Sequence, residues 1–388
     1  MTTLVSLDQA ALGTGLRRGR EQAGMTQTAA AAQLGLSQAA LNQYESGKRR
    51  VDALTLERLS RLYGVPLRAF FGGEPARPDW EEALRLRARE LSPAGWTGVM
   101  RLIEALHDLE LLHAKTGIDL PGEPYPPFAA LPDAPALRDD VARWAEKARR
   151  HFDLGVAPLP DLRGFLEAQG YKVFTVSLGR DEADLSGLYL RHPEHGPIVA
   201  LNADKAYTRR AFTMAHELAH ALFHHDRTAV LCRSDDQRPI EQFADCFASY
   251  FLVPPEALHD RLRRSGWRSV GDPEQIVHLA RYFGISYHAM RRRLMEERRL
   301  DVSLPAQDVK PVALARALGY RPSRFEFGER PLPPEERFPR AYLDLARRAI
   351  QQRTLSPLRV AEMLDISELE LEDLLSPQRV EAPEEACA

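Results

Sequence analysis

The stretch Arg210-Ala-Phe-Thr-Met-Ala-His-Glu-Leu-Ala-His220 carries an H-E-x-x-H motif inside a strongly helical segment. On a helix, positions i and i+4 share a face, so His216 and His220 can bind one metal ion. Glu217 can then polarise a metal-bound water and shuttle its proton. A pair of surface histidines is the alternative. The apolar neighbours favour a buried helix instead; they are Phe212, Met214, Ala215, Leu218, Ala219 and Leu222. Because burying two histidines and a glutamate without binding partners costs folding free energy, a buried position favours a metal site.

A catalytic zinc site needs three protein ligands and an open fourth position, so a third ligand is expected downstream. Asp226 occupies the place of the last ligand in the extended H-E-x-x-H-x-x-G-x-x-H pattern, but Phe223 replaces the required glycine. His224 and His225 follow too closely on the motif for easy facial coordination.

Glu241 and Asp245 are better candidates, since they lie four apart on a helix predicted over residues 240–252. One carboxylate can bind the metal while the other orients a ligand histidine from behind. For Glu241, a solvated acid at the start of a helix remains the alternative.

Three short β-rich segments precede the motif, at residues 172–176, 185–190 and 197–202. They predict a small mixed α+β core. If strand 197–202 is an exposed edge, an extended peptide can add to it, although a closed inner strand is an equal alternative. Asn202 and Arg210 are candidate substrate contacts, with a surface salt bridge as the alternative for Arg210.

The chain has 388 residues, which is enough for two to three domains of about 150 residues. Three cysteines are too few for a disulfide framework, and neither a secretory signal nor an apolar stretch of membrane-spanning length is present. We therefore expect a cytoplasmic protein that is mainly α-helical. The predicted blocks are residues 1–73, a helix with a proline-rich linker at 74–135, the α+β core at 136–300, and a helical region with a frayed acidic tail at 301–388.

The N-terminal block predicts an all-α bundle with short helices at 27–34 and 38–45, separated by a glycine turn, as in a helix-turn-helix unit. Ser37 can cap the second helix, and Gln38 and Asn42 would face outward, where amides can bond adenine edges. Residues 1–73 hold nine basic and five acidic side chains, a net charge of +4 within a chain of −3. A bundle for dimerisation or protein docking is the alternative.

A second helix-turn-helix pattern lies at residues 355–375. Its second helix is Glu368-Leu-Glu-Leu-Glu-Asp-Leu-Leu375, which is acidic and would repel phosphates. We interpret it as a packing or partner-binding element.

Two resemblances to known families follow from these motifs. Gly24-Met-Thr-Gln27, Gly35-Leu-Ser-Gln38 and Tyr44-Glu-Ser-Gly-Lys48 resemble the XRE/Cro-type helix-turn-helix family over about residues 12–71. That resemblance adds Gln27 to the expected DNA-facing set. With the basic residues that follow the second helix, the predicted DNA-binding residues are Gln27, Ser37, Gln38, Asn42, Lys48, Arg49 and Arg50.

The stretches 198–202, 210–220, 241–248 and 252–254, with Leu279-Ala-x-x-Phe-Gly-Ile-Ser286, resemble the ImmA/IrrE family of zinc metallopeptidases over about residues 136–300. The resemblance implies a zincin-like core with His216, His220 and Glu241 as zinc ligands and Glu217 as general base. Asp245 falls where the family has Asn or Asp, and we expect it to orient a ligand. Because His₂Glu sites accept several divalent ions, manganese or another ion remains an alternative to zinc.

The resemblances imply a DNA-binding regulatory metalloendopeptidase that cleaves a protein, such as a helix-turn-helix repressor, in a stress, phage or mobile-element response. The expected partners are a double-stranded DNA operator and a protein substrate, with no membrane; the sequence leaves a homodimer open. The alternative is a transcriptional regulator or antitoxin-like protein whose zinc domain senses or scaffolds without proteolysis.

Overall fold

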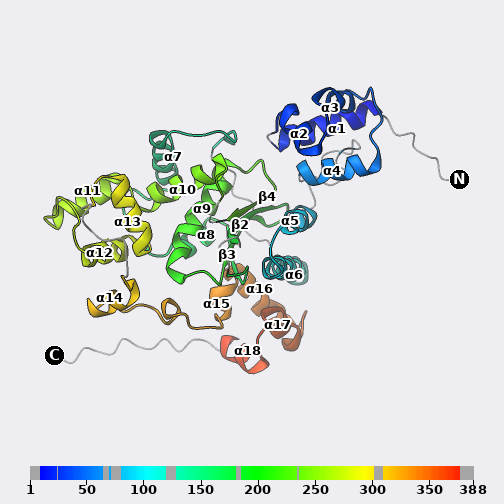
Figure 1. Ribbon diagram of the computed structural model, residues 1–388. Helices are drawn as coiled ribbons and strands as arrows, with labels where there is room; N and C mark the ends of the chain where they lie inside the picture. Colours follow the sequence, from blue (N-terminus) through cyan, green and yellow to red (C-terminus); the bar gives the residue numbers. More distant parts are fainter. Residues whose placement is uncertain are drawn as a thin grey trace, which may run out of the picture.

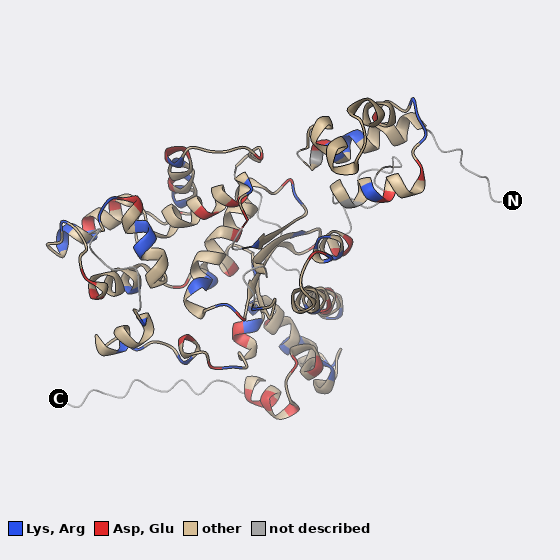
Figure 2. Ribbon diagram, viewed as in Figure 1, with Lys and Arg blue, Asp and Glu red and all other residues tan. Residues whose placement is uncertain are grey.

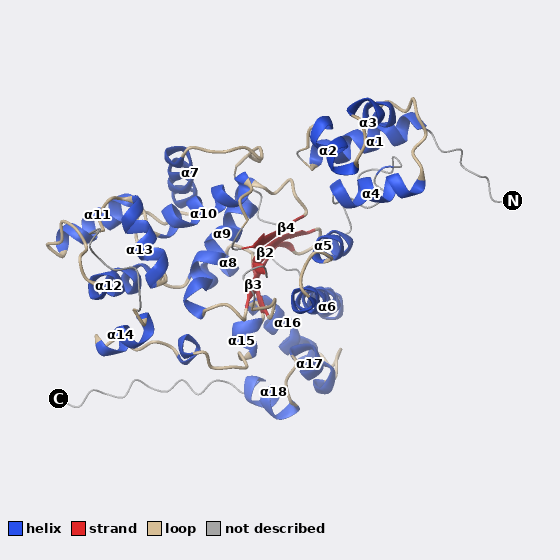
Figure 3. Ribbon diagram, viewed as in Figure 1, coloured by secondary structure: helices blue, strands red, loops and turns tan. Residues whose placement is uncertain are grey.

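A small sheet lies at the centre of the chain and is surrounded by helices (Figures 1 and 3). The computed structural model describes residues 9–23, 25–63, 70, 80–118, 128–180, 185–233, 236–300 and 309–375. Within them the protein is mainly helical, with a mixed α+β core and a separate N-terminal helical bundle. The predicted fold class is confirmed. The predicted acidic tail, at 381–388, lies outside the described residues.

The sheet has four strands in the order β1-β3-β2-β4. β1 runs parallel to β3, whereas β2 is antiparallel to both β3 and β4. The strand bounds are β1 Lys172–Val176, β2 Leu185–His192, β3 Gly196–Asn202 and β4 Ala229–Arg233.

The edge-strand hypothesis for residues 197–202 is wrong, because β3 is paired on both sides and all seven of its residues are buried. Its apolar sequence on both faces is that of an inner strand. β4, which the sequence analysis missed, lies at an end of the sheet instead.

One face of the sheet packs against the helix that carries the H-E-x-x-H motif, α9 (Arg210–Phe223), and against its neighbour α10 (Pro239–Leu252). Val173, Tyr189 and Val199 from the strands share this core with aromatic and aliphatic side chains of both helices. The other helices of this layer are α7 (Arg138–His151), α8 (Leu162–Ala168), α11 (Pro255–Arg264), α12 (Pro273–Phe283), α13 (Tyr287–Glu296) and α14 (Pro311–Ala317).

The opposite face is covered by helices from two distant parts of the chain. Leu188, Leu190 and Ile198 from the strands form one core with residues of the helices on this side. These helices are α5 (Trp80–Ala88), α6 (Pro93–Thr116), α16 (Arg340–Gln351), α17 (Pro357–Leu364) and α18 (Glu368–Leu375). The predicted boundaries at residues 135 and 300 therefore do not separate independent hydrophobic cores. The short α15 (Pro334–Arg337) contacts β1.

The N-terminal helices form a core of their own around Leu16, Leu41 and Leu59. Their bounds are α1 Gln9–Gln22, α2 Gln27–Leu34, α3 Gln38–Glu45 and α4 Ala53–Tyr63. Gly35 ends α2 with φ of +67°, a left-handed conformation that favours glycine, and so makes the predicted turn. No described helix combines the length and apolarity needed to cross a bilayer.

Candidate metal centre

Two packed helices bring three metal-binding side chains together. His216 and His220 project from α9, and Glu241 comes from the first turn of α10. The two Nε2 atoms lie 3.2 Å apart, and the Glu241 carboxylate oxygens lie 3.2 Å from His216 Nε2 and 3.6 Å from His220 Nε2. All three side chains are buried. The structure thus joins the residues that the sequence analysis proposed as ligands.

The other ring nitrogen of each histidine is held from behind. Nδ1 of His216 lies 3.0 Å from Oδ1 of Asp245, and Nδ1 of His220 lies 3.0 Å from Nδ1 of His224. A hydrogen bond from Nδ1–H of His216 to Asp245 leaves the lone pair of Nε2 directed into the centre. This contact matches the orienting role expected for Asp245. His224, which the sequence analysis set aside as a ligand, contacts a ligand candidate instead.

This donor set fits a divalent cation. Two imidazole nitrogens and a carboxylate converge in a buried space, and such a cluster needs a positive charge at its centre. Burial lowers the pKa of His216, but hydrogen bonds to Asp245 and Glu241 outweigh burial and raise it to about 10. Burial also opposes ionisation of Glu241, yet hydrogen bonds from the two histidines hold its pKa far below the usual range. In the metal-free chain, a proton on His216 supplies the charge that a metal ion would otherwise provide.

Glu217 lies beside this cluster, between α9 and strands β2 and β4, and is fully buried. Its Oε1 has no hydrogen-bond partner among the described residues, and its Oε2 accepts the thiol hydrogen of Cys232 at 3.3 Å. Burial is the main reason that the pKa of Glu217 is raised to about 8. Gly187 on β2 makes room for the carboxylate, because a Cβ there would lie 2.7 Å from Oε1. A carboxylate with an unused oxygen and a pKa near neutrality is suited to accept and release a proton.

Cys232 is the residue that the sequence analysis missed at this centre. Its Sγ and one donor atom each of His216, His220 and Glu241 all lie within 4.8 Å of one another. It stands on β4, which the apolar run Ala229-Val-Leu-Cys-Arg233 between polar neighbours could have indicated. Burial and the nearby Glu217 raise the pKa of the thiol, which is consistent with its donating to Glu217.

The remaining downstream candidates lie elsewhere. Asp226 is exposed and does not belong to the donor cluster. Nε2 of His225 contacts the backbone carbonyl of Phe128 at 3.0 Å.

The two residues proposed to contact substrate, Asn202 and Arg210, instead bind other groups of the protein. Asn202 donates to the carbonyls of Gly179 and Leu185 and accepts from the amides of Leu178 and Asp204, so its hydrogen-bonding capacity is used. Asn202 therefore holds the loop beside β3.

Arg210 is also buried and pairs with Glu336 at 2.8 Å. Its guanidinium lies 4.4 Å from the ring centroid of Tyr207. The contact joins the start of α9 to α15, so it is an internal ion pair and not the surface pair that the sequence analysis considered.

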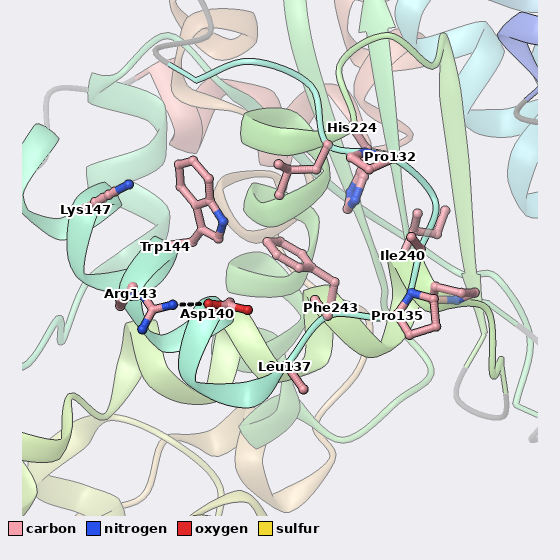
Figure 4. A pocket seen from close by; sticks show the side chains of 14 residues that line it. Pro132, Pro135, Leu137, Asp140, Arg143, Trp144, Lys147, His224, Ile240 and Phe243 are labelled. Atoms are coloured by element: carbon pink, nitrogen blue, oxygen red, sulfur yellow. Dashed lines mark hydrogen bonds and ion pairs between the residues drawn. The ribbon is translucent and has the colours of Figure 1, made fainter.

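A cavity of about 440 Å³ lies next to the centre (Figure 4). His224, Trp144 and Phe243 line it, together with Leu131, Pro132 and residues 134–137. Because His224 contacts His220, this cavity reaches the back of the metal-binding cluster. Its mainly apolar lining offers space for a side chain of a bound peptide.

In the N-terminal bundle, Gln38, Asn42, Lys48, Arg49 and Arg50 are exposed on α3 or just after it. In Figure 2, blue marks the basic residues along the ribbon of this bundle, and red marks the acidic residues of α18.

Three residues of the predicted DNA-binding set make hydrogen bonds within the bundle, and one of these bonds runs from Gln27 to Asn42 at 3.4 Å. Ser37 accepts from the amide of Ala40 as the N-cap of α3. Gln27 donates to Glu45 at 2.8 Å.

Comparison with known families agrees with both parts of this description. Residues 166–295 match the family model of the IrrE N-terminal-like domain, a peptidase family, and residues 16–70 match the helix-turn-helix family model. Among curated proteins the chain has no match. The chain therefore combines a helix-turn-helix domain with a peptidase-family domain, in the predicted order.

Proposed function

We propose that this protein is a DNA-binding regulator that cleaves another protein at a zinc centre held by His216, His220 and Glu241. The observation that carries the proposal is the convergence of these three donors beside the buried, half-unpartnered carboxylate of Glu217. Manganese or another divalent ion would suit the same donors. The helix-turn-helix match supports DNA binding.

A bound divalent ion would supply Lewis acidity toward a peptide carbonyl and toward water. Glu217 would act as the general base and then as the general acid. It would take a proton from water as the peptide is attacked and return the proton to the leaving amine. Asp245 and His224 keep the two imidazole rings in place during this exchange. Burial of the whole cluster limits competing solvent and strengthens each electrostatic contact.

The substrate that fits best is an extended segment of a protein. β4 lies at an end of the sheet and carries Cys232, so a peptide bound along its outer edge would pass the centre. Side chains of Arg87 and Arg238 donate to the carbonyls of Ala229 and Leu231 on this strand, and a peptide would take over such contacts. A helix-turn-helix repressor near the bound operator, in a cytoplasmic stress, phage or mobile-element response, is the substrate we propose.

A second candidate function rests on Cys232. If its sulfur also binds the metal, the two histidines, Glu241 and Cys232 fill all four positions of a tetrahedral coordination sphere. No coordination position then remains for water or substrate. The chain would then be a transcriptional regulator whose zinc domain senses or scaffolds. The hydrogen bond from the thiol to Glu217 favours the peptidase, because it keeps the sulfur protonated.

The test is co-expression of the chain with the helix-turn-helix proteins encoded beside its gene. We expect one of them to disappear with the wild-type chain and to persist with Glu217→Gln, while the zinc content of the two chains is equal. Persistence of every partner with the wild-type chain, or loss with both chains, would overturn the proposal.

The coordination of Cys232 is tested separately with cobalt. We expect the Co²⁺-loaded wild-type chain and its Cys232→Ser variant to share one spectrum without a sulfur-to-cobalt charge-transfer band. A band that is lost in Cys232→Ser would favour the four-ligand sensor.

A further inference from the structure

A second group of metal-binding side chains lies on the opposite side of the sheet from α9. His113 stands in the last turn of α6, and Glu194 and His195 form the turn between β2 and β3. One donor atom of each lies within 4.8 Å of the others. α6 packs on the sheet face of Leu188 and Leu190, whereas the H-E-x-x-H helix packs on the other face. This second cluster is therefore distinct from the centre described above.

His195 has an unusual environment for a buried polar side chain. It is 1 % exposed, and neither of its ring nitrogens has a hydrogen-bond partner among the described residues. A buried polar atom without a partner costs folding free energy, so such sites call for an explanation. The ring of His113 approaches His195 with 5.3 Å between the ring centroids. The unused nitrogens therefore lie where a second imidazole is already present.

The turn that carries two of these donors is held in place by another histidine. Nδ1 of His192 accepts from the backbone amides of Glu194 and His195, both at 3.2 Å, so its Nε2–H can donate to Glu110 at 3.1 Å. Its ring stacks on that of His195 at 4.7 Å. His192 is thus fully engaged, and its contacts fix the turn for the two donors that follow it.

The helix end beside the cluster also suits a bound cation. The partial negative charge at the C-terminal end of α6 favours a cation beside His113.

We propose that His113, Glu194 and His195 form a second binding site for a divalent transition-metal ion, which joins α6 to the turn between β2 and β3. Two imidazoles and one carboxylate select zinc and similar ions over magnesium or calcium. Donors about 2.1 Å from a tetrahedral ion stand about 3.4 Å apart, and the three donor atoms here lie within 4.8 Å of one another. Glu194 is exposed and His113 is half-buried, so rotation of these two side chains can adjust the donor spacing to the ion.

The experiment measures zinc bound per full-length chain after removal of metal, equilibration with Zn²⁺ and dialysis. We expect two equivalents for the wild-type chain, one for His113→Gln, and one for His195→Gln. His107→Gln is the matched control, because His107 lies on the same helix, bonds to Glu81 and Glu110, and is outside the cluster. It should retain two equivalents.

Loss of the second equivalent is then assigned with a background that lacks the first centre. In His216→Ala/His220→Ala we expect one equivalent, visible as a Co²⁺ absorption band that His113→Gln removes while circular dichroism is unchanged. One equivalent in the wild-type chain that depends only on His216 and His220, or two that survive both His113→Gln and His195→Gln, would overturn the proposal. A chain whose only equivalent depends on His113 would instead overturn the proposed peptidase centre and leave this site standing.

Discussion

The candidate DNA-reading residues and the candidate metal-binding residues lie in opposite environments. Gln38 and Asn42 are exposed on α3, and the bundle beneath them is held by other side chains. His216, His220 and Glu241 are buried, and they help to join α9 to α10. In the first region, Gln38 and the basic residues 48–50 would serve function while other residues hold the fold, and of the predicted DNA-binding set Gln27, Ser37 and Asn42 also make internal hydrogen bonds. In the second region, function and stability rest on the same residues.

This difference follows from the cost of desolvation. An exposed side-chain amide stays hydrated until DNA replaces the water, so it needs no hydrogen-bond partner within the protein. A buried imidazole or carboxylate loses water on folding and must find partners in the protein. Substitutions should therefore separate function from stability in the bundle and couple them in the centre.

The largest loss of stability is expected at a buried ion pair in the N-terminal bundle, where charged side chains do hold the fold together. Glu45 and Arg20 form a buried ion pair, with Nε to Oε1 at 2.6 Å. Glu45→Gln removes the buried counter-charge of the guanidinium, leaves it only the exposed Glu21 at 3.6 Å, and should cost about 3–5 kcal/mol of bundle stability. Hydrogen exchange of the α1 and α3 amides in the full chain measures it. Arg17→Gln, which removes an exposed guanidinium paired with Glu21, is the control and should change stability by less than about 0.5 kcal/mol. Equal effects of the two changes would contradict the prediction.

In the centre, Asp245→Asn should weaken zinc binding by about 10–100-fold, because the amide no longer holds Nδ1–H of His216 as a charged acceptor. Competition with a chelator of known affinity measures the change. Asp260→Asn on α11, where the carboxylate pairs with Arg263 and Arg264, is the control. Unchanged zinc affinity in Asp245→Asn would show that this contact does not orient the ligand.

On the exposed side, Gln38→Ala should reduce discrimination for one adenine in an operator selected in vitro, by about 1–3 kcal/mol. Bundle stability should not change. Gln33→Ala, exposed on α2, serves as the control. Lys48→Ala should instead weaken binding to all sequences and lower the slope of the salt dependence by about one. The prediction fails if Gln38→Ala behaves like Lys48→Ala.

The smallest effect concerns the pH dependence of metal uptake. Because the pKa of His216 is raised to about 10 in the metal-free chain, zinc must displace a proton from it below that pH. Between pH 6 and 7.5 the apparent binding constant should rise about tenfold per pH unit. Titrations in buffers of different ionisation enthalpy would count the released proton. Asp245→Asn, which removes a group that raises this pKa, should give a shallower slope, and pH-independent uptake by the wild-type chain would rule out the displaced proton.

The comparison also shows where prediction from the sequence works. The helices at 27–34 and 38–45 and strand 172–176 were predicted to the residue, because glycine, Ser37 and short apolar runs mark their ends locally. The pairing of His216 with His220 follows from helical periodicity alone. Strand β4 and its Cys232 were missed, although the apolar run Ala229-Val-Leu-Cys-Arg233 between polar neighbours is as long as the predicted strand 172–176. The edge hypothesis for 197–202 failed because strand order depends on contacts across the chain.

The two helix-turn-helix patterns show the same limit. The N-terminal one builds a core of its own, while α17 and α18 share a core with α6 and the sheet. The two sequence patterns are alike. What differs is the apolar surface that each pair of helices packs against, and this depends on the rest of the fold.

The sequence by itself determined the motif, the caps and turns, and the charge of each block, because these depend on neighbours along the chain. The tertiary structure decided that Glu241 meets the two histidines, that Cys232 stands beside Glu217, and that His195 is buried near His113. Each of these contacts joins residues from different elements. It is set by how helices and strands bury their apolar faces, which no short stretch of sequence specifies.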